Sequence, residues 1–435
     1  MAVTTQTKAR SKKAARSARQ ANISAGILRK TPKSSFPDTF TPMLATLADK
    51  PFDHAGWLYE IKWDGYRALA FMNRKSTELR SRNNKSFNEQ FYPVYEAVKA
   101  WGLHAVIDGE IAVINAAGQS DFSLLQQWRS EADGRLIYYV FDILWLNGHD
   151  LSQLPLSTRR AVLEEQIRTV PGDIIRLSES FDATGTEFFN IAKQMGLEGI
   201  IAKRAESLYY PGERSRDWLK IKTSNRQEVV IGGYTKNEGS GKPFSSLLVG
   251  VFENGKLQYT GKIGTGFNAQ QQKQLLQQFK ALEVKKSPFA VVPDINKPSR
   301  FRPNPPQAVA VWLKPRLVCG VSFREMTSDG VMRHPSFEGM REDKGANEVT
   351  REEKVSVQLA VGSGQSKKGI ARLAIGKRIP TPAGRSSRKT LLNPSEETQV
   401  REVGGHPLKF TNLSKVFWPK EKISKRDMLN YYYQV

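Results

Sequence analysis

The stretch Glu60-Ile61-Lys62-Trp63-Asp64-Gly65-Tyr66-Arg67 says the most about the fold. Apolar and aromatic residues over 57–62 and 66–72 predict two strands on either side of an Asp-Gly turn. Alternate residues of a strand share a face, so Glu60 and Lys62 are expected to point to the same side. An isolated Lys-x-Asp-Gly is usually a solvated strand end, and the rest of the chain decides whether this lysine has a chemical role.

Three further segments place charges on apolar strands. Asp108 and Glu110 share one face of a predicted strand, where two carboxylates are costly to bury unless they are paired or bound to a metal. Glu198 stands at the head of another apolar strand, and Lys220 and Lys222 share a face of a third. Together with Lys62, these residues provide a nucleophile, carboxylates for a metal and cations for phosphate within one region of the chain.

The composition favours a protein that acts on a polyanion. The chain has 435 residues, of which 39% are hydrophobic, and this excludes global disorder. Its formal net charge of +23 is best tolerated beside nucleic acid. The single cysteine, Cys319, excludes a disulfide framework and a four-cysteine zinc site, and is expected to be a small core residue. No apolar run is long enough to span a bilayer, so we expect a cytoplasmic protein.

Charge and periodicity divide the chain into five predicted segments. Nine Lys/Arg and no acid precede residue 38, and periodicity is lost after residue 345. Five short strands and one helix, with a hairpin signal at Asn254-Gly255, fit a small barrel of the OB type; two of these strands are expected over 309–313 and 317–325. The segments are a disordered basic arm (1–36), an α+β domain (37–223), an OB-fold barrel (224–345), a flexible linker (346–406) and the opening of a further domain (407–435).

The motifs together resemble the ATP-dependent DNA ligases of the covalent nucleotidyltransferase superfamily, most closely the ligase module of the bacterial end-joining ligases D. The resemblance covers about residues 37–345, and 410–419 resemble the start of the primase-polymerase domain of those proteins. Several motifs in the right order are far more specific than one. They are 60–67, Ser81-Arg82-Asn83, Asp108-Gly109-Glu110, 139–142, 198–203, 218–222 and 333–343.

The resemblance implies an adenylation domain in which Lys62 attacks the α-phosphate of ATP. AMP then passes to a 5′-phosphate, and a 3′-OH displaces it. The implied cofactors are ATP and Mg²⁺ (or Mn²⁺), with Glu110 and Glu198 as metal ligands. Lys62 must be neutral to attack, and nearby cations and the metal are expected to lower its pKa.

The resemblance also implies a nucleotide-binding set. The metal-binding carboxylates lie beside it, and residues after 345 are expected to be dispensable for sealing. The implied set is Glu60 near adenine, Phe141 stacked on adenine, Arg67 at the ribose and phosphate, Arg82 at the ribose or nick phosphate, Glu110 at the metal, Lys220 and Lys222 on the α-phosphate, and Arg341 with Asp343 on the pyrophosphate.

The implied partners are double-stranded DNA with nicks or ends and a Ku-like end-binding protein, for a monomeric enzyme of non-homologous end joining on the bacterial nucleoid. Two other hypotheses stay open from the residues alone. RNA ligases and RNA-capping guanylyltransferases share the Lys-x-Asp-Gly nucleophile, and the chain could be a non-catalytic DNA-binding remnant. NAD-dependent ligases are disfavoured because they carry a four-cysteine zinc module.

Overall fold

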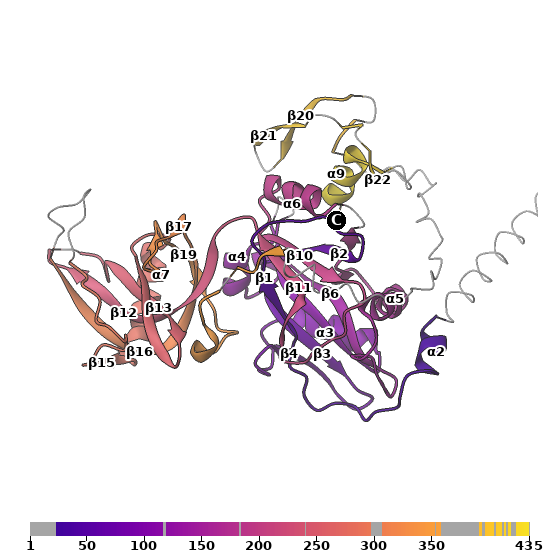
Figure 1. The fold of residues 1–435 in the computed structure, drawn as a ribbon, viewed down its shortest axis with the longest axis horizontal. Coiled ribbons are helices and arrows are strands. Elements are labelled where there is room, and N and C mark those ends of the chain that lie inside the picture. The colour runs from indigo at the N-terminus through magenta and orange to yellow at the C-terminus, as the bar shows by residue number, and fades with distance from the viewer. Residues whose placement is uncertain are drawn as a thin grey trace, which may run out of the picture.

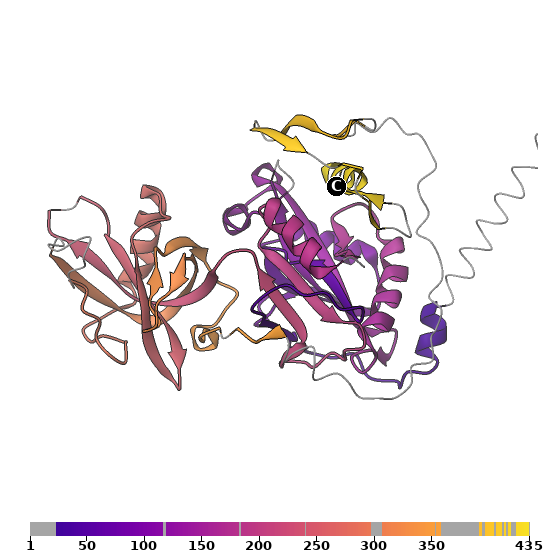
Figure 2. The ribbon, with the colours of Figure 1, turned by 45° about the horizontal axis from the view of Figure 1, so that its top comes forward.

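The structure, a computed structural model, consists of a two-sheet domain, a barrel and a small C-terminal segment (Figures 1 and 2). No helix of the described chain is both long and apolar enough to cross a membrane. The α+β domain followed by a small barrel agrees with the predicted fold class. The described residues are 23–434 except 116–118, 182–183, 240, 297–306, 353, 358–390, 394–395, 404–405, 411–412, 415 and 419–422.

The larger domain is built on two sheets. The first has the strand order β1 (Leu44–Leu47), β11 (Arg214–Lys222), β10 (Gly199–Arg204), β2 (Trp57–Ile61) and β9 (Ser180–Phe181). The second has the order β4 (Thr77–Ser81), β3 (Tyr66–Met72), β5 (Ala105–Ile114), β6 (Arg135–Leu146) and β7 (His149–Asp150), with β8 (Ile175–Leu177) parallel to β6. The helices are α3 (Tyr92–Trp101), α4 (Phe122–Gln127), α5 (Leu156–Gln166) and α6 (Gly185–Gln194).

The Asp-Gly pair of the nucleophile motif is not a hairpin turn, which corrects the prediction. β2 and β3 belong to different sheets, and the chain crosses from one sheet to the other between them. The backbone N–H of Lys62 still donates to the carbonyl of Gly199, at 3.0 Å. A Cβ on Gly65 would lie 2.1 Å from the carbonyl oxygen of Ile111, so only glycine allows this passage against β5. Lys62 therefore stands at the junction of the two sheets.

The barrel follows the domain as a six-stranded sheet. Its strands are β14 (Lys256–Ile263), β13 (Ser246–Glu253), β12 (Arg226–Asn237), β16 (Ala308–Ser322) and β15 (Glu283–Val284) in this order, with β19 (Ser336–Met340) on β16 and α7 (Ala269–Lys280) after β14. The hairpin at Asn254-Gly255 is confirmed, with both φ angles positive. The strands expected over 309–313 and 317–325 form the single strand β16, and Cys319 is fully buried in the barrel core.

Residues 23–36 correct part of the predicted arm, whereas residues 1–22 lie outside the described chain. Helix α2 (Ile23–Leu28) packs on α5, where the backbone N–H and hydroxyl of Ser24 donate to Glu165 at 2.9 and 2.8 Å. Phe36 stacks on the ring of His104, with 5.5 Å between centroids. Apolar side chains thus anchor residues 23–36 to the domain, although the basic composition suggested a disordered arm up to 36.

The chain after residue 345 corrects the predicted linker at both ends. Residues 346–357 pack against both domains, as described below. Strands β20 (Gln399–Val403) and β21 (His406–Phe410) form a hairpin, so ordered structure begins before residue 407. The remaining elements are β22 (Val416–Trp418), β23 (Ile423–Ser424) and α9 (Lys425–Gln434). Residues 358–390 of the predicted linker lie outside the described chain.

Candidate active site

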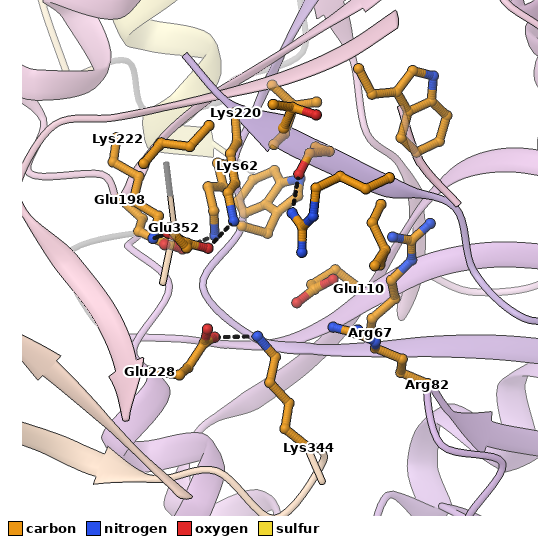
Figure 3. Close-up of a pocket in the computed structure, with 18 of the residues that line it drawn as sticks. Lys62, Arg67, Arg82, Glu110, Glu198, Lys220, Lys222, Glu228, Lys344 and Glu352 are labelled. Atoms are coloured by element: carbon orange, nitrogen blue, oxygen red, sulfur yellow. Dashed lines mark hydrogen bonds and ion pairs between the residues drawn. The ribbon is translucent and has the colours of Figure 1, made fainter. Parts of the chain in front are cut away.

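One cavity of about 540 Å³ gathers every predicted site residue. Its walls come from both sheets of the larger domain, from the barrel and from the segment that follows the barrel (Figure 3). Residues separated by up to 281 positions in the sequence thereby face one space. The predicted residues that line it are Glu60, Lys62, Arg67, Arg82, Glu110, Phe141, Glu198, Lys220, Lys222 and Arg341.

Lys62 and Glu198 form an ion pair at the junction of the sheets. Burial opposes the lysine's charge, but Glu198, Asp64 and Glu110 outweigh it and raise the pKa of Lys62. The expectation that nearby cations and a bound metal lower the pKa of Lys62 stays a prediction.

Glu110 has the electrostatic character of a cation ligand. Burial raises the pKa of its carboxyl to about 8, although Lys62, Arg67 and Arg341 oppose the shift. Within the described chain no Lys, Arg or His lies within ion-pair distance of this carboxylate. A divalent cation would supply the missing positive charge through the oxygen ligands that it prefers. Glu110 and Glu198 line the same cavity and so fit a shared metal ion.

The side of the cavity beside Glu60 is sealed by buried ion pairs. Glu60 is 2% exposed and accepts from Arg160 on α5 at 2.8 Å and from Lys203 on β10 at 3.0 Å. The hydroxyl of Ser178 donates to its second oxygen at 3.2 Å. Arg160 also donates to the carbonyl of Ser178, at 3.0 Å. Both carboxylate oxygens of Glu60 therefore have partners within the domain.

An aromatic box adjoins this group. Lys203 Nζ lies 4.2 Å from the ring centre of Phe141 and 4.4 Å from that of Trp218. The guanidinium of Arg67 lies 5.4 Å from the Phe141 ring and is held by Asp108 at 2.9 and 2.5 Å. These contacts hold the ring of Phe141 in place at the wall of the cavity that it lines. Flat rings beside a fixed carboxylate suit a planar heterocycle with an exocyclic amine.

The opposite side of the cavity carries cations whose partners come from other parts of the chain. Lys220 and Lys222, both on β11, pair with Glu352, which follows the barrel. Arg82 pairs with Glu348 at 3.2 Å. Burial lowers the pKa of Lys220 to about 8, although Glu352 opposes the shift. Lys62, Lys220 and Lys222 converge here and Arg82 faces them across the cavity, so four positive side chains line one space, as a phosphate site requires.

The barrel contributes the last predicted cation. Arg341 donates two hydrogen bonds of 3.0 Å to Asp343 and lies over the rings of Phe122 and Tyr66. Asp343 lines the cavity as the partner of Arg341. His334 has a positive φ of 51° between β18 (Met332–Arg333) and β19, and is not among the cavity-lining residues.

Sequence reasoning missed four residues that hold the predicted ones in place. Lys203 is the last residue of the segment 198–203, in which only Glu198 was given a role, so the sequence pattern already contained this lysine. Arg160 lies on an unpredicted helix and looks like a solvated charge. Glu348 and Glu352 lie in a stretch without periodicity, which was interpreted as a linker.

Comparison with known proteins identifies two family regions. Residues 42–222 match the ATP dependent DNA ligase domain, and residues 240–344 match the ATP dependent DNA ligase C terminal region. The first covers both sheets and the second covers most of the barrel.

Curated relatives agree with this assignment. The multifunctional non-homologous end joining protein LigD of Pseudomonas aeruginosa is 34% identical over 387 residues, which is 88% of this chain and 44% of that protein. DNA ligase C1 of Mycolicibacterium smegmatis is 30% identical over 311 residues, which is 67% of this chain and 85% of that protein. The chain thus spans less than half the length of the LigD relative.

A solved structure supports the same grouping. A mycobacterial DNA ligase D complexed with ATP and MES matches with a TM-score of 0.52 and 33% identity, covering 72% of this chain and 98% of that chain.

Proposed function

The chain belongs to the ATP-dependent DNA ligases, and from this premise we propose that it seals 5′-phosphate/3′-OH breaks through AMP carried on Lys62. The observation that carries the proposal is the position of Lys62 at the junction of two sheets, in a cavity lined by all the predicted nucleotide-binding residues. The motif-based resemblance to this family is thereby confirmed at the level of the family.

In the first step the amine of Lys62 attacks the α-phosphate of ATP. The Nζ–P bond forms, the bond to the pyrophosphate oxygen breaks and pyrophosphate leaves. The amine must first give up a proton, and the ion pair with Glu198 opposes this. Burial by itself lowers the pKa of the amine, and Glu198 would no longer offset this if it held a cation, which would favour the neutral nucleophile.

We assign Glu110 and Glu198 as the residues that hold Mg²⁺ or Mn²⁺. The ion would supply positive charge against the nucleotide phosphates. Glu110 supports this assignment because its pKa of about 8 reflects a buried carboxylate without sufficient positive charge nearby. The structure contains no arrangement of three or more His, Cys, Asp or Glu side chains for a metal within its described part, so phosphate oxygens and water would complete the coordination.

The other predicted residues bind the nucleotide. Glu60 is suited to accept a hydrogen bond from the adenine amine, and Phe141 offers a ring face to the base. Lys220 and Lys222 would neutralise charge on the α-phosphate as it becomes five-coordinate. Arg67 would contact the ribose and phosphate, Arg82 the ribose or nick phosphate, and Arg341 the pyrophosphate.

In the later steps AMP moves to the DNA 5′-phosphate and the 3′-OH displaces it. The net charge of +23 supports binding to the phosphate backbone irrespective of sequence. The resemblance to LigD supports a role in non-homologous end joining, and we propose that the chain acts on the nucleoid with a Ku-like protein at the DNA end. These assignments are transferred to the chain from relatives, and the chain spans only part of their length.

The decisive experiment offers α-labelled ATP or GTP to the chain with Mg²⁺ and then adds nicked DNA. We expect covalent label from ATP only, its release by nicked DNA, and a sealed strand. Lys62→Ala should show no label, whereas Lys193→Ala, an exposed lysine on α6, should label normally. Labelling by GTP would favour a capping enzyme, and absence of label from both would favour a DNA-binding remnant.

A further inference from the structure

Residues 346–357, here called the strap, cross from the barrel to the two-sheet domain. At the barrel end, the backbone N–H of Phe252 donates to Val349 at 2.8 Å, and Arg351 pairs with Glu253 at 2.6 Å. At the other end, the backbone N–H of Val355 donates to Leu47 at 2.9 Å. The strap is therefore anchored on both sides of the cavity that it closes.

Val357 fixes the far end of the strap. Its side chain is 5% exposed and packs in the core beneath the first sheet, together with Trp57 and Phe188. Its backbone N–H donates to the Asp49 carboxylate at 3.1 Å. The strap is thus part of the folded domain rather than the start of a free linker.

The strap presents two carboxylates, Glu348 and Glu352, to the predicted phosphate-binding cations. One oxygen of Glu352 pairs with Lys220 and the other lies 2.8 Å from Lys222. Glu348 lies 3.2 Å from Arg82 across the same cavity. Figure 3 shows Glu352 among Lys62, Lys220 and Lys222, with Arg82 on the opposite side of the cavity.

These carboxylates stand where a phosphate would be held. Lys220 and Lys222 are only 15% and 11% exposed, so an anion is needed to offset the cost of keeping two cations there. Although burial opposes ionisation, the two lysines hold the pKa of Glu352 at about 2, so the carboxylate stays charged at neutral pH. A phosphate group would form charge-assisted hydrogen bonds with the same two ammonium groups. The Glu352 carboxylate and the phosphate therefore compete for one binding position.

From this competition, and resting on the proposed function, we propose that Glu352 sets the affinity for the nucleotide by occupying the α-phosphate position on Lys220 and Lys222. The nucleotide must displace Glu352, and with it the strap, to bind. Glu348 acts in the same way on Arg82. Nucleotide binding is thereby coupled to release of the contact that joins the barrel to the two-sheet domain.

A different role for Glu352 makes the opposite prediction. If the carboxylate positioned the lysines for catalysis, its removal would weaken phosphate binding. The structure favours competition because Glu352 uses both oxygens on the lysines and thus takes the ammonium groups that a phosphate would need.

The test measures binding of AMP and of adenosine by calorimetry in the full chain. Neither ligand has a pyrophosphate to lose, so no adduct forms and the result does not depend on the proposed ligase activity. We expect Glu352→Gln to bind AMP on the order of tenfold more tightly. This is the gain expected if Glu352 occupies the phosphate position about nine-tenths of the time in the wild type and the variant leaves that position free. Adenosine lacks the phosphate, so its affinity should not change.

Two further variants make the result specific. Glu325→Gln removes the exposed partner of Arg333, away from both the strap and the cavity, and leaves Glu352 on the lysines, so AMP affinity should stay at the wild-type level. Glu352→Asp keeps the charge on a shorter side chain and should give an intermediate gain, which also tests the idea if Glu352→Gln fails to fold. Weaker or unchanged AMP binding in Glu352→Gln overturns the proposal. So does an equal gain for adenosine or for Glu325→Gln.

Discussion

The two sides of the cavity differ in where their charges find partners. On the base side, Glu60 is held by Arg160 and Lys203, which belong to the same domain and are nearly inaccessible to water. On the phosphate side, Lys220 and Lys222 find their counter-charge on the strap, which arrives from the barrel. The ion pairs of the base side form when the two-sheet domain folds. The ion pairs of the phosphate side depend on the strap, whose carboxylates another anion can replace.

This difference matches what each side has to do. Recognition of a base requires hydrogen-bonding groups in fixed positions. An unpaired buried charge destabilises the fold, and a carboxylate that points elsewhere cannot accept a hydrogen bond from the base. Phosphates are present in one step and absent or transferred in the next, so the cations that hold them need another anion in the interval. The strap carboxylates supply that anion.

The largest effect is expected on the base side. Arg160→Ala leaves the Glu60 carboxylate buried with only Lys203 and Ser178, and should lower the free energy of unfolding by about 3 to 5 kcal/mol. Urea denaturation measures this change. Arg168→Ala, an exposed arginine just beyond the same helix, is the matched control and should be neutral. Equal losses in both variants would contradict the fixed base side.

A smaller effect is expected from cutting the strap. A chain that ends at Gly345 loses Val355 and Val357 from the first sheet, and should be less stable by about 2 kcal/mol. A chain that ends at Val357 keeps both anchors and should match the full chain in the unfolding transition of the two-sheet domain. The expectation that residues after 345 are dispensable for sealing stays a prediction, and nick sealing by the two truncated chains tests it.

Arg341→Ala separates the steps of the reaction. Arg341 is assigned to the pyrophosphate, which is present only when Lys62 is adenylated. The rate of adduct formation should therefore fall about tenfold, equivalent to ~1.4 kcal/mol, more than the rate of sealing a pre-adenylated nick. Comparable losses in both assays would move Arg341 from the nucleotide to the DNA or to the barrel fold.

The smallest effect is expected in the pH dependence of stability without metal. The carboxyl of Glu110 has its pKa raised from 4.5 to about 8, so the folded chain binds more protons than the unfolded chain between these values. The stability contributed by this group is therefore complete at low pH and lost as the pH rises through that window. Partial exposure makes the slope shallow.

Glu110→Gln should flatten this slope, and Mg²⁺ should reverse it in the wild type by stabilising the ionised carboxylate. Unfolding midpoints in urea at several pH values, with and without the ion, provide the measurement. A slope that Glu110→Gln does not alter would assign the pH dependence to another group.

The site residues could be predicted because each belongs to a short strand pattern. Glu60, Glu110 and Lys220 stand on apolar strands and Lys62 directly follows one, where a charged side chain is unusual, and the structure brings them to one cavity. The pairing of those strands could not be predicted. An Asp-Gly pair between two strands has the local chemistry of a hairpin, and only the close passage past β5 reveals a crossing between sheets.

The partners of the site residues were harder to find from the sequence. Arg160 lies on a helix whose charges look solvated, and its burial depends on Glu60, a hundred positions away. Glu352 lies in a polar stretch without periodicity, which has the composition of a linker. Both residues are ordered by long-range ion pairs, and no local pattern encodes such a pair.

Hydrogen exchange before and after adenylation tests the contrast between the two sides most directly. With ATP and Mg²⁺, the backbone amides of 346–357 should exchange faster once AMP displaces Glu352, while those of α5 and β2 on the base side should be unchanged or better protected. Greater protection of the strap on adenylation, or faster exchange of α5 together with it, would contradict an exchangeable phosphate side opposite a fixed base side.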